Sequence, residues 1–117
     1  MAAYTVQSVT EAGVVPTYTA VSATDTFTPS AADYDKTHIL HVKNAGGSPD
    51  SVVIDDISSL SNAAGATAYN PDVTVVVSNA TERFIRLTPI RRYLQANGTV
   101  AVTNSFTTTV TAAVFVA

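Results

Sequence analysis

Apolar and polar residues alternate over most of the chain, as they do in β-strands that bury one face. The clearest case begins at Val73, which shares one face of an extended strand with Val75 and Val77. After a short polar break the apolar run resumes at Phe84, and Pro89 ends it because a proline cannot donate to a β-ladder. We therefore predict a β-hairpin that finishes just before this proline and packs on further strands.

A second hairpin is predicted over residues 37–57. Its strands are 37–44 and 51–57, and the stretch between them is rich in Gly, Ser and Pro, which is typical of a turn. The dipeptide Asn97-Gly98 has the composition of a type I′ turn. The other predicted segments are strands or extended pieces at 2–10, 18–23, 25–27, 99–104 and 107–116, a short strand or turn at 90–95, and a surface loop at 58–69.

Turn signals recur at intervals of about 8–12 residues, and no long segment has the helical period. This spacing predicts an all-β fold: a compact antiparallel β-sandwich or jelly-roll-like barrel of about eight strands. The chain of 117 residues fits one domain, 1–117, in which 1–12 is a candidate extended N-terminal arm.

The composition favours a chain that packs against partners. Only 13% of the residues are charged, whereas globular proteins average about 25%, so Thr, Ser and Asn must cover much of the surface. The net charge is −3 and no run of Lys or Arg resembles a nucleic-acid footprint, which argues against a nucleic-acid ligand. No apolar run approaches the roughly 20 residues that span a bilayer, so we expect no membrane partner and synthesis in a cytoplasm.

The residues that could act in catalysis or bind a metal ion are not spaced so that they would form a common site. His38 and His41 are three apart on one predicted strand and point to opposite faces, so they cannot easily share a metal ion. Calcium ligation by scattered Asp residues stays an alternative, although no calcium-loop motif is present. The chain has no cysteine and no nucleophile elbow or phosphate loop. We therefore expect no enzymatic activity, no cofactor and no metal.

The most asymmetric feature is a group of four arginines within residues 83–92. Guanidinium groups pair well with carboxylates, so this stretch is a candidate contact for an acidic partner. A solvated rim, or pairing with Glu82 inside the sheet, is the alternative. The N-terminal arm is a candidate for strand addition to a neighbouring sheet edge. The candidate partner contacts are therefore Tyr4, Val6, Val9, Arg83, Arg86, Arg91 and Arg92.

Three stretches, 13–18, 36–44 and 79–83, resemble small proteins encoded among the structural genes of tailed bacteriophages. In several phages such proteins are capsid decoration proteins, also called cement or minor capsid proteins. The resemblance implies a structural protein of the virion that binds the outer surface of the shell formed by the major capsid protein. It also implies a homo-oligomer, often a trimer, on the capsid exterior after synthesis in the host cytoplasm.

Two other functions compete with capsid decoration. One is a structural role in the neck or tail of the phage. The other is a carbohydrate- or host-binding β-sandwich, for which a patch of exposed aromatic side chains would be needed. The candidate residues for such a patch are Tyr18, Tyr34, Tyr69 and Tyr93.

Overall fold

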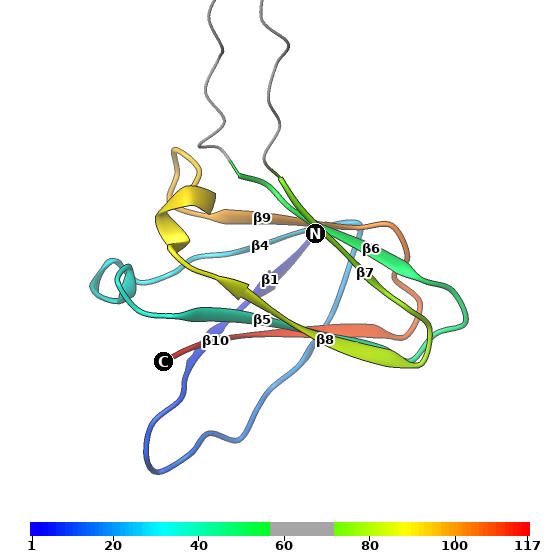
Figure 1. The fold of residues 1–117 in the computed structure, drawn as a ribbon, viewed down its shortest axis with the longest axis horizontal. Helices are drawn as coiled ribbons and strands as arrows, with labels where there is room; N and C mark the ends of the chain where they lie inside the picture. Colours follow the sequence, from blue (N-terminus) through cyan, green and yellow to red (C-terminus); the bar gives the residue numbers. More distant parts are fainter. Residues whose placement is uncertain (57–71) are drawn as a thin grey trace, which may run out of the picture.

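The computed structural model describes residues 1–56 and 72–117, which form a β-sandwich with two short 3-10 helices (Figure 1). The all-β prediction is thus confirmed. The predicted surface loop at 58–69, with Tyr69, lies outside the described residues. The elements are β1 (Ala2–Tyr4), β2 (Val6–Ser8), β3 (Thr19–Ala20), β4 (Thr24–Phe27), η1 (Ala31–Asp33), β5 (His38–Asn44), β6 (Asp50–Ile54), β7 (Val73–Val77), β8 (Thr81–Leu87), η2 (Ile90–Tyr93), β9 (Val100–Asn104) and β10 (Val110–Val116).

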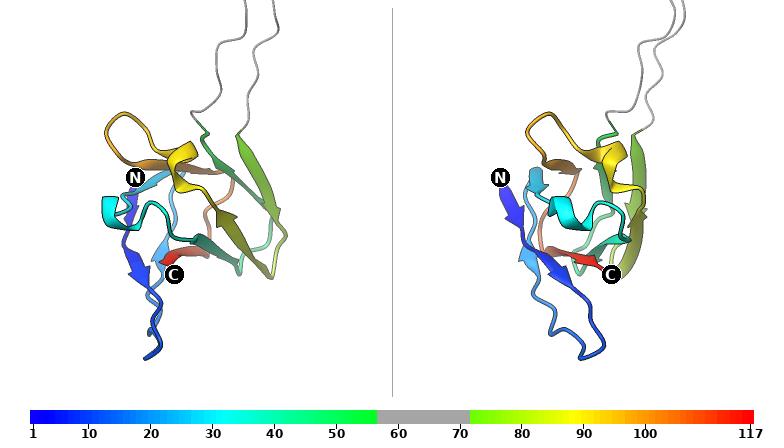
Figure 2. Two further views of the ribbon diagram at one scale, coloured as in Figure 1. Left: turned by 60° about the vertical axis from the view of Figure 1, so that its left-hand side comes forward. Right: turned by 90° about the vertical axis from the view of Figure 1, so that its left-hand side faces the viewer.

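The strands form two sheets that face each other as layers (Figure 2). Sheet A has the order β1-β4-β9-β6-β7, and sheet B has the order β2-β10-β5-β8, with β3 also paired to β10. Most pairs are antiparallel, as predicted, but β1–β4 and β2–β10 are parallel, so both sheets are mixed. The parallel pairs arise because the chain passes from sheet A to sheet B at Thr5, and each short strand adds to an outer edge.

The two predicted hairpins are wrong. Strand β5 lies in sheet B and β6 in sheet A, while β7 lies in sheet A and β8 in sheet B. The connections therefore cross from one layer to the other, and β6 pairs with β7, with Val52 opposite Val75. Alternation predicts which face of a strand is buried, but a short loop can either fold back in the plane of a sheet or span the roughly 10 Å between sheets.

Local contacts explain the crossing between β5 and β6. The side chain of Asn44 donates to the carbonyl oxygens of Ser48 (2.8 Å) and Val77 (3.0 Å) and accepts from the backbone N–H of Gly46 (2.9 Å). Gly46 itself has no room for a side chain, because a Cβ there would lie 2.4 Å from the Phe106 ring. The buried amide and this close approach bend the chain out of sheet B.

The turn at Asn97-Gly98 is present but is not of type I′. Gly98 has a φ of 82°, whereas Asn97 does not have a positive φ, and a type I′ turn requires both. Gly98 donates its N–H to the carbonyl of Gln95 (2.8 Å), which closes the turn.

The peptide bond between Thr88 and Pro89, at the end of β8, is cis.

The core lies between the inner faces of the two sheets and follows the predicted alternation. Leu40 and Val42 of β5 are buried, as are the inner-facing residues of β10. On β7, Val73, Val75 and Val77 all point inward, as predicted. The inner-facing core residues of β10 are Val110, Ala112, Val114 and Val116.

The candidate N-terminal arm is part of the sandwich in residues 2–8, which form β1 and β2. Tyr4 is buried and donates its hydroxyl to Asp25 Oδ2 at 2.5 Å. Asp25 also accepts the backbone N–H of Ala2 at 2.8 Å and the hydroxyl of Ser22. Tyr4 is therefore corrected from a partner contact to a core residue, because its ring fills the interior and its hydroxyl satisfies a buried carboxylate.

Candidate binding surface

The outer face of sheet B carries the most unusual surface of the described chain. On β8 the side chains alternate, so that Ile85 and Leu87 are buried while Phe84 and Arg86 point outward. The register places Phe84 beside His41 of β5, and Arg86 beside Ile39. Phe84 is 67% exposed, and it adjoins other apolar side chains, so it belongs to a contiguous exposed apolar patch.

The ring of His41 packs against the ring of Phe84 and holds it in place. The two rings stack with centroids 3.9 Å apart and planes inclined by 10°. The Nδ1 atom of His41 lies 2.7 Å from the Tyr18 hydroxyl, and its Nε2 atom lies 3.2 Å from Glu82 Oε1. An imidazole protonated at Nε2 satisfies both contacts, donating to the carboxylate and accepting from the hydroxyl. The exposed ring of Phe84 therefore sits on a fixed base.

The segment between β2 and β3, residues 9–18, projects from the body of the sandwich (Figures 1 and 2). Gln7 ties together the two ends of this segment. The Gln7 side-chain amide donates to the carbonyl of Thr17 and accepts the Thr17 N–H, each at 2.8 Å. One side of this segment and the outer face of sheet B enclose an open groove of about 280 Å³. The groove is lined by Val9, Val14, Pro16, Tyr18, Ile39, Phe84 and Phe115.

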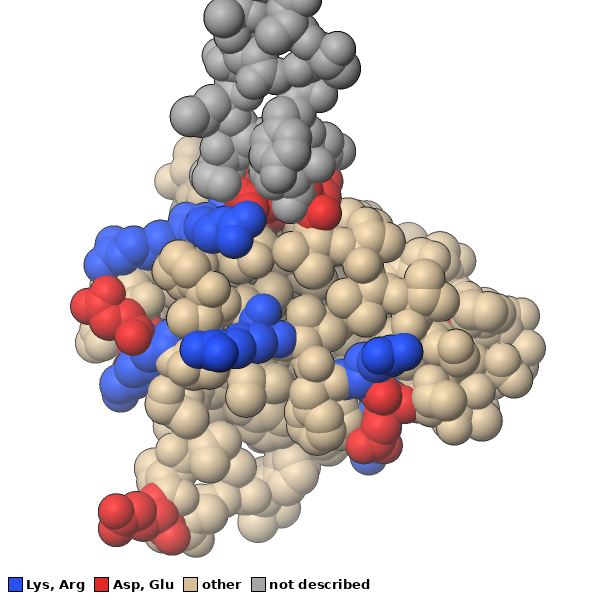
Figure 3. Space-filling view, viewed as in Figure 1, with Lys and Arg blue, Asp and Glu red and all other residues tan. Residues whose placement is uncertain are grey.

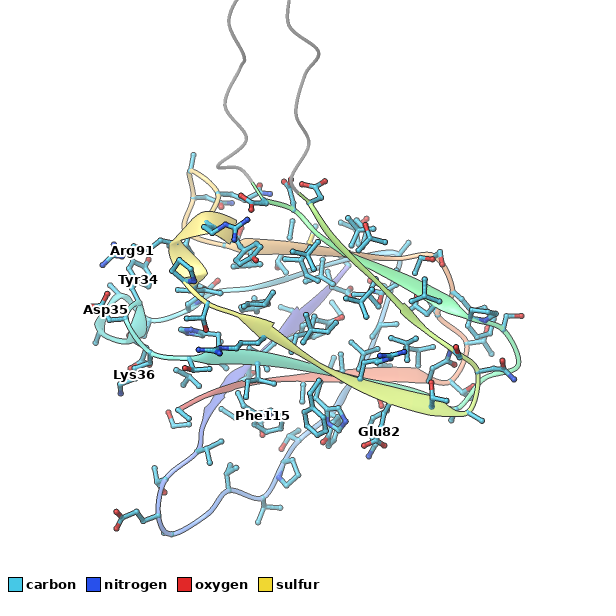
Figure 4. The ribbon with its side chains drawn as sticks, in the orientation of Figure 1. Tyr34, Asp35, Lys36, Glu82, Arg91 and Phe115 are labelled. Atoms are coloured by element: carbon cyan, nitrogen blue, oxygen red, sulfur yellow. The ribbon has the colours of Figure 1, made fainter. Side chains whose placement is uncertain are left out.

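Almost all of the groove wall is apolar, and charged groups lie beside it rather than in it. Figure 4 shows Glu82 and Phe115 on the same side of strands β5 and β10. Arg86 is exposed on the groove face of β8 and Arg83 is exposed on the opposite face; neither forms an ion pair with any described residue. Of the predicted contacts, Val9 lines this groove, and Val6 is partly buried against the core.

Arg91 and Arg92 lie elsewhere, on η2. Arg92 pairs with the buried Asp56 at 2.6 Å, and Arg91 lies 3.9 Å from Asp35 and over the ring of Tyr34. Figure 4 shows Arg91, Tyr34 and Asp35 together at one end of the molecule. On the face seen in Figure 3 the basic side chains occur in separate groups, with neutral or acidic surface between them.

The four arginines predicted as one cluster therefore lie in two separate places, Arg83 and Arg86 on β8 and Arg91 and Arg92 on η2. The pair on η2 is occupied by acids of the same chain, and the pair on β8 is not, within the described part. The predicted pairing of an arginine with Glu82 is not formed there, because His41 takes that carboxylate.

Tyr18, Tyr34 and Tyr93, the candidate tyrosines that the structure describes, do not form a common patch. Tyr93 is buried, Tyr34 lies beside Arg91, and Tyr18 contacts His41. Within residues 1–56 and 72–117, Phe84, Phe115 and Tyr18 form an aromatic surface along the groove. Sequence reasoning missed it by treating Phe84 as one apolar run with Ile85 and Leu87. The signal was available, because adjacent residues of a strand point to opposite faces.

The two histidines lie on opposite faces of β5, as predicted. His38 is fully buried on the inner face, and its Nδ1 atom is 3.2 Å from the carbonyl oxygen of Lys36. Burial lowers the pKa of His38, against smaller opposing effects of that carbonyl and of Asp33. Within residues 1–56 and 72–117, no three His, Asp or Glu side chains are grouped in a way that could hold a metal ion.

No family model matches the chain, and no curated protein or solved structure is significantly similar to it. The part of the chain that the structure describes contains no helix of the length and apolarity needed to cross a bilayer.

Proposed function

We propose that this chain is a structural protein of a phage virion that binds the outer surface of the capsid shell, through the outer face of sheet B. The observation that supports it is the apolar groove with the exposed Phe84 ring on a rigid sheet. Burying exposed aromatic surface against a partner is favourable, by about 25 cal/mol per Å² of area removed from water. A fixed ring also loses little conformational entropy on binding.

The charges beside the groove specify the chemistry of the partner. Arg86, which points outward beside Ile39, offers a guanidinium group with no ion-pair partner among the described residues. A carboxylate of the shell near an apolar side chain would satisfy both features. Stable interfaces bury roughly 800 Å² per partner, and a decoration protein multiplies modest contacts by its copy number.

The resemblance to phage structural proteins adds the capsid as the partner and a trimer as the expected assembly. A role in the neck or tail uses the same kind of surface but places few copies at one position of the particle. Carbohydrate binding is favoured by one observation, the exposed Phe84 ring, since sugars stack on aromatic faces.

The test is to mix the purified chain with shells of the phage that encodes it, sediment the particles and count the bound copies. Saturable binding of many copies over the whole shell supports the proposal. Binding restricted to one vertex or to the tail supports the neck or tail role instead. Binding to a glycan array without binding to shells would contradict decoration.

A further inference from the structure

Strand β8 forms an open end of sheet B. Strand β5 occupies one of its edges, and no strand of the described part pairs with the other. Only Ile85 and Leu87 of its seven residues are buried. An unpaired edge of this length presents a row of backbone N–H and C=O groups that another strand can bind.

The outward side chains of β8 are Glu82, Phe84 and Arg86, an acid and a base placed symmetrically about an aromatic ring. If two copies of β8 pair in antiparallel fashion about Phe84, Glu82 of each copy faces Arg86 of the other. The two Phe84 rings then face each other on the two-fold axis. Opposite charges and aromatic pairs directly across two strands are both stabilising.

We propose that two copies of this chain associate edge to edge through β8, in this register, and form one continuous sheet. Sliding the strands by one pairing step in either direction removes both contacts between Glu82 and Arg86. One of those steps also places Arg83 opposite Arg83. The sequence of the strand therefore selects a single symmetric register.

The surroundings of β8 prepare it for this contact. The ring of Phe84 is already fixed by stacking on His41, and Glu82 is held by His41 at 3.2 Å. Little side-chain entropy is lost when the second copy binds. The two-fold axis is perpendicular to the sheet, so both apolar grooves lie on the same side of the pair. This arrangement is independent of any shell and can be tested on the chain alone.

A pair of seven-residue strands buries less than the roughly 800 Å² per partner of a stable interface. We therefore expect a dissociation constant on the order of micromolar or weaker, seen as a dependence of mass on concentration. Sedimentation velocity of the full chain should show a shift from 12.2 kDa towards twice that mass. Raised salt should weaken the pair.

Charge reversal tests the register. Arg86→Glu alone and Glu82→Arg alone each replace two attractive contacts by two repulsive ones, and each should raise the dissociation constant at least about tenfold. An equimolar mixture of the two variants restores both contacts and should associate again. Arg83→Glu is the matched control, because it changes the net charge as Arg86→Glu does but faces Ile85 of the second copy; it should have a much smaller effect.

Three results would overturn the inference: a monomer at every concentration, a trimer that none of these variants affects, or a mixture that does not associate although each variant keeps the circular dichroism of the parent chain. If the chain does not pair through β8, the proposal of shell binding still stands, because shell binding is measured separately on particles. Failure of shell binding likewise leaves the two-fold pair in solution.

Discussion

Two buried aspartates show how the same side chain serves opposite energetic roles. Burial raises the pKa of Asp25, but hydrogen bonds from Ser22, Tyr4 and Ala2 outweigh it and hold that pKa below its usual value. Asp50 accepts only two backbone N–H groups, from Ser105 and Phe106, and burial raises its pKa. The first carboxylate is therefore stabilised in its charged form, and the second is not.

Replacing each aspartate by asparagine should separate these roles. Asp25→Asn points an N–H group at donors and should lower the free energy of unfolding by about 2–3 kcal/mol at pH 7. Asp50→Asn keeps an oxygen for both backbone donors and should change it by less than about 1 kcal/mol. Urea unfolding at pH 7 measures both.

The two aspartates also predict opposite dependences on pH. The contribution of Asp25 is present above the unfolded pKa of about 4 and is lost as the pH falls through its lower folded value, so the deficit of Asp25→Asn should shrink in acid. Asp50, with a raised pKa, favours the protonated form, so its ionisation destabilises the fold as the pH rises. Equal losses in both variants would contradict this account.

His38 predicts a further loss of stability in mild acid. Its pKa is lowered by burial, so below the unfolded value of about 6.5 the unfolded chain binds more protons than the folded one. Stability should therefore fall as the pH drops from about 6.5 towards the folded pKa. His38→Leu should remove this part of the slope in thermal unfolding measured over that range, and an unchanged slope would exclude His38 as its source.

At the scale of elements, strand positions and buried faces could be predicted, and strand partners could not. The inner faces of β5, β7 and β10 follow directly from the alternation of apolar residues. Whether the loop after Asn44 turns within the sheet or crosses to the other depends on contacts of Asn44 with Val77 and of Gly46 with Phe106. These residues are distant in sequence, so no local pattern contains the information.

The crossing loop gives a prediction with a built-in control. A Cβ on Gly46 would lie 2.4 Å from the Phe106 ring and 2.5 Å from the Thr108 carbonyl oxygen, and the backbone oxygen cannot move aside easily. Gly46→Ala should therefore reduce stability by about 1–3 kcal/mol. A Cβ on Gly47 meets nothing within 4 Å, so Gly47→Ala should change stability by less than about 0.5 kcal/mol.

Chemical denaturation of the two glycine variants, followed by circular dichroism, measures this difference. Equal effects would mean that the close approach at Gly46 relaxes without loss and does not determine the path of the chain between the sheets.

At the scale of the whole molecule, the two outer faces differ in a way that composition does not reveal. The outer face of sheet A carries the exposed Val76, whereas the outer face of sheet B carries Phe84 and adjoins segment 9–18, which turns this apolar surface into a groove. The groove joins residues from β5, β8, β10 and the segment 9–18, so it depends on the order of strands in sheet B. The sequence predicted Val9 and Arg86 for this region but missed Phe84 and Phe115.

This asymmetry supplies the sharpest test of the proposed binding face. Val14, 38% exposed, lines the groove, and Val76, 49% exposed, lies on the outer face of sheet A. Val14→Asp places a carboxylate in an apolar groove and should weaken attachment to shells at least about tenfold, since burying an unpaired charge is unfavourable. Val76→Asp adds the same charge to the opposite face and should leave attachment unchanged. Binding curves from particle sedimentation compare the two variants, and equal weakening, or weakening by Val76→Asp alone, would move the binding face away from sheet B.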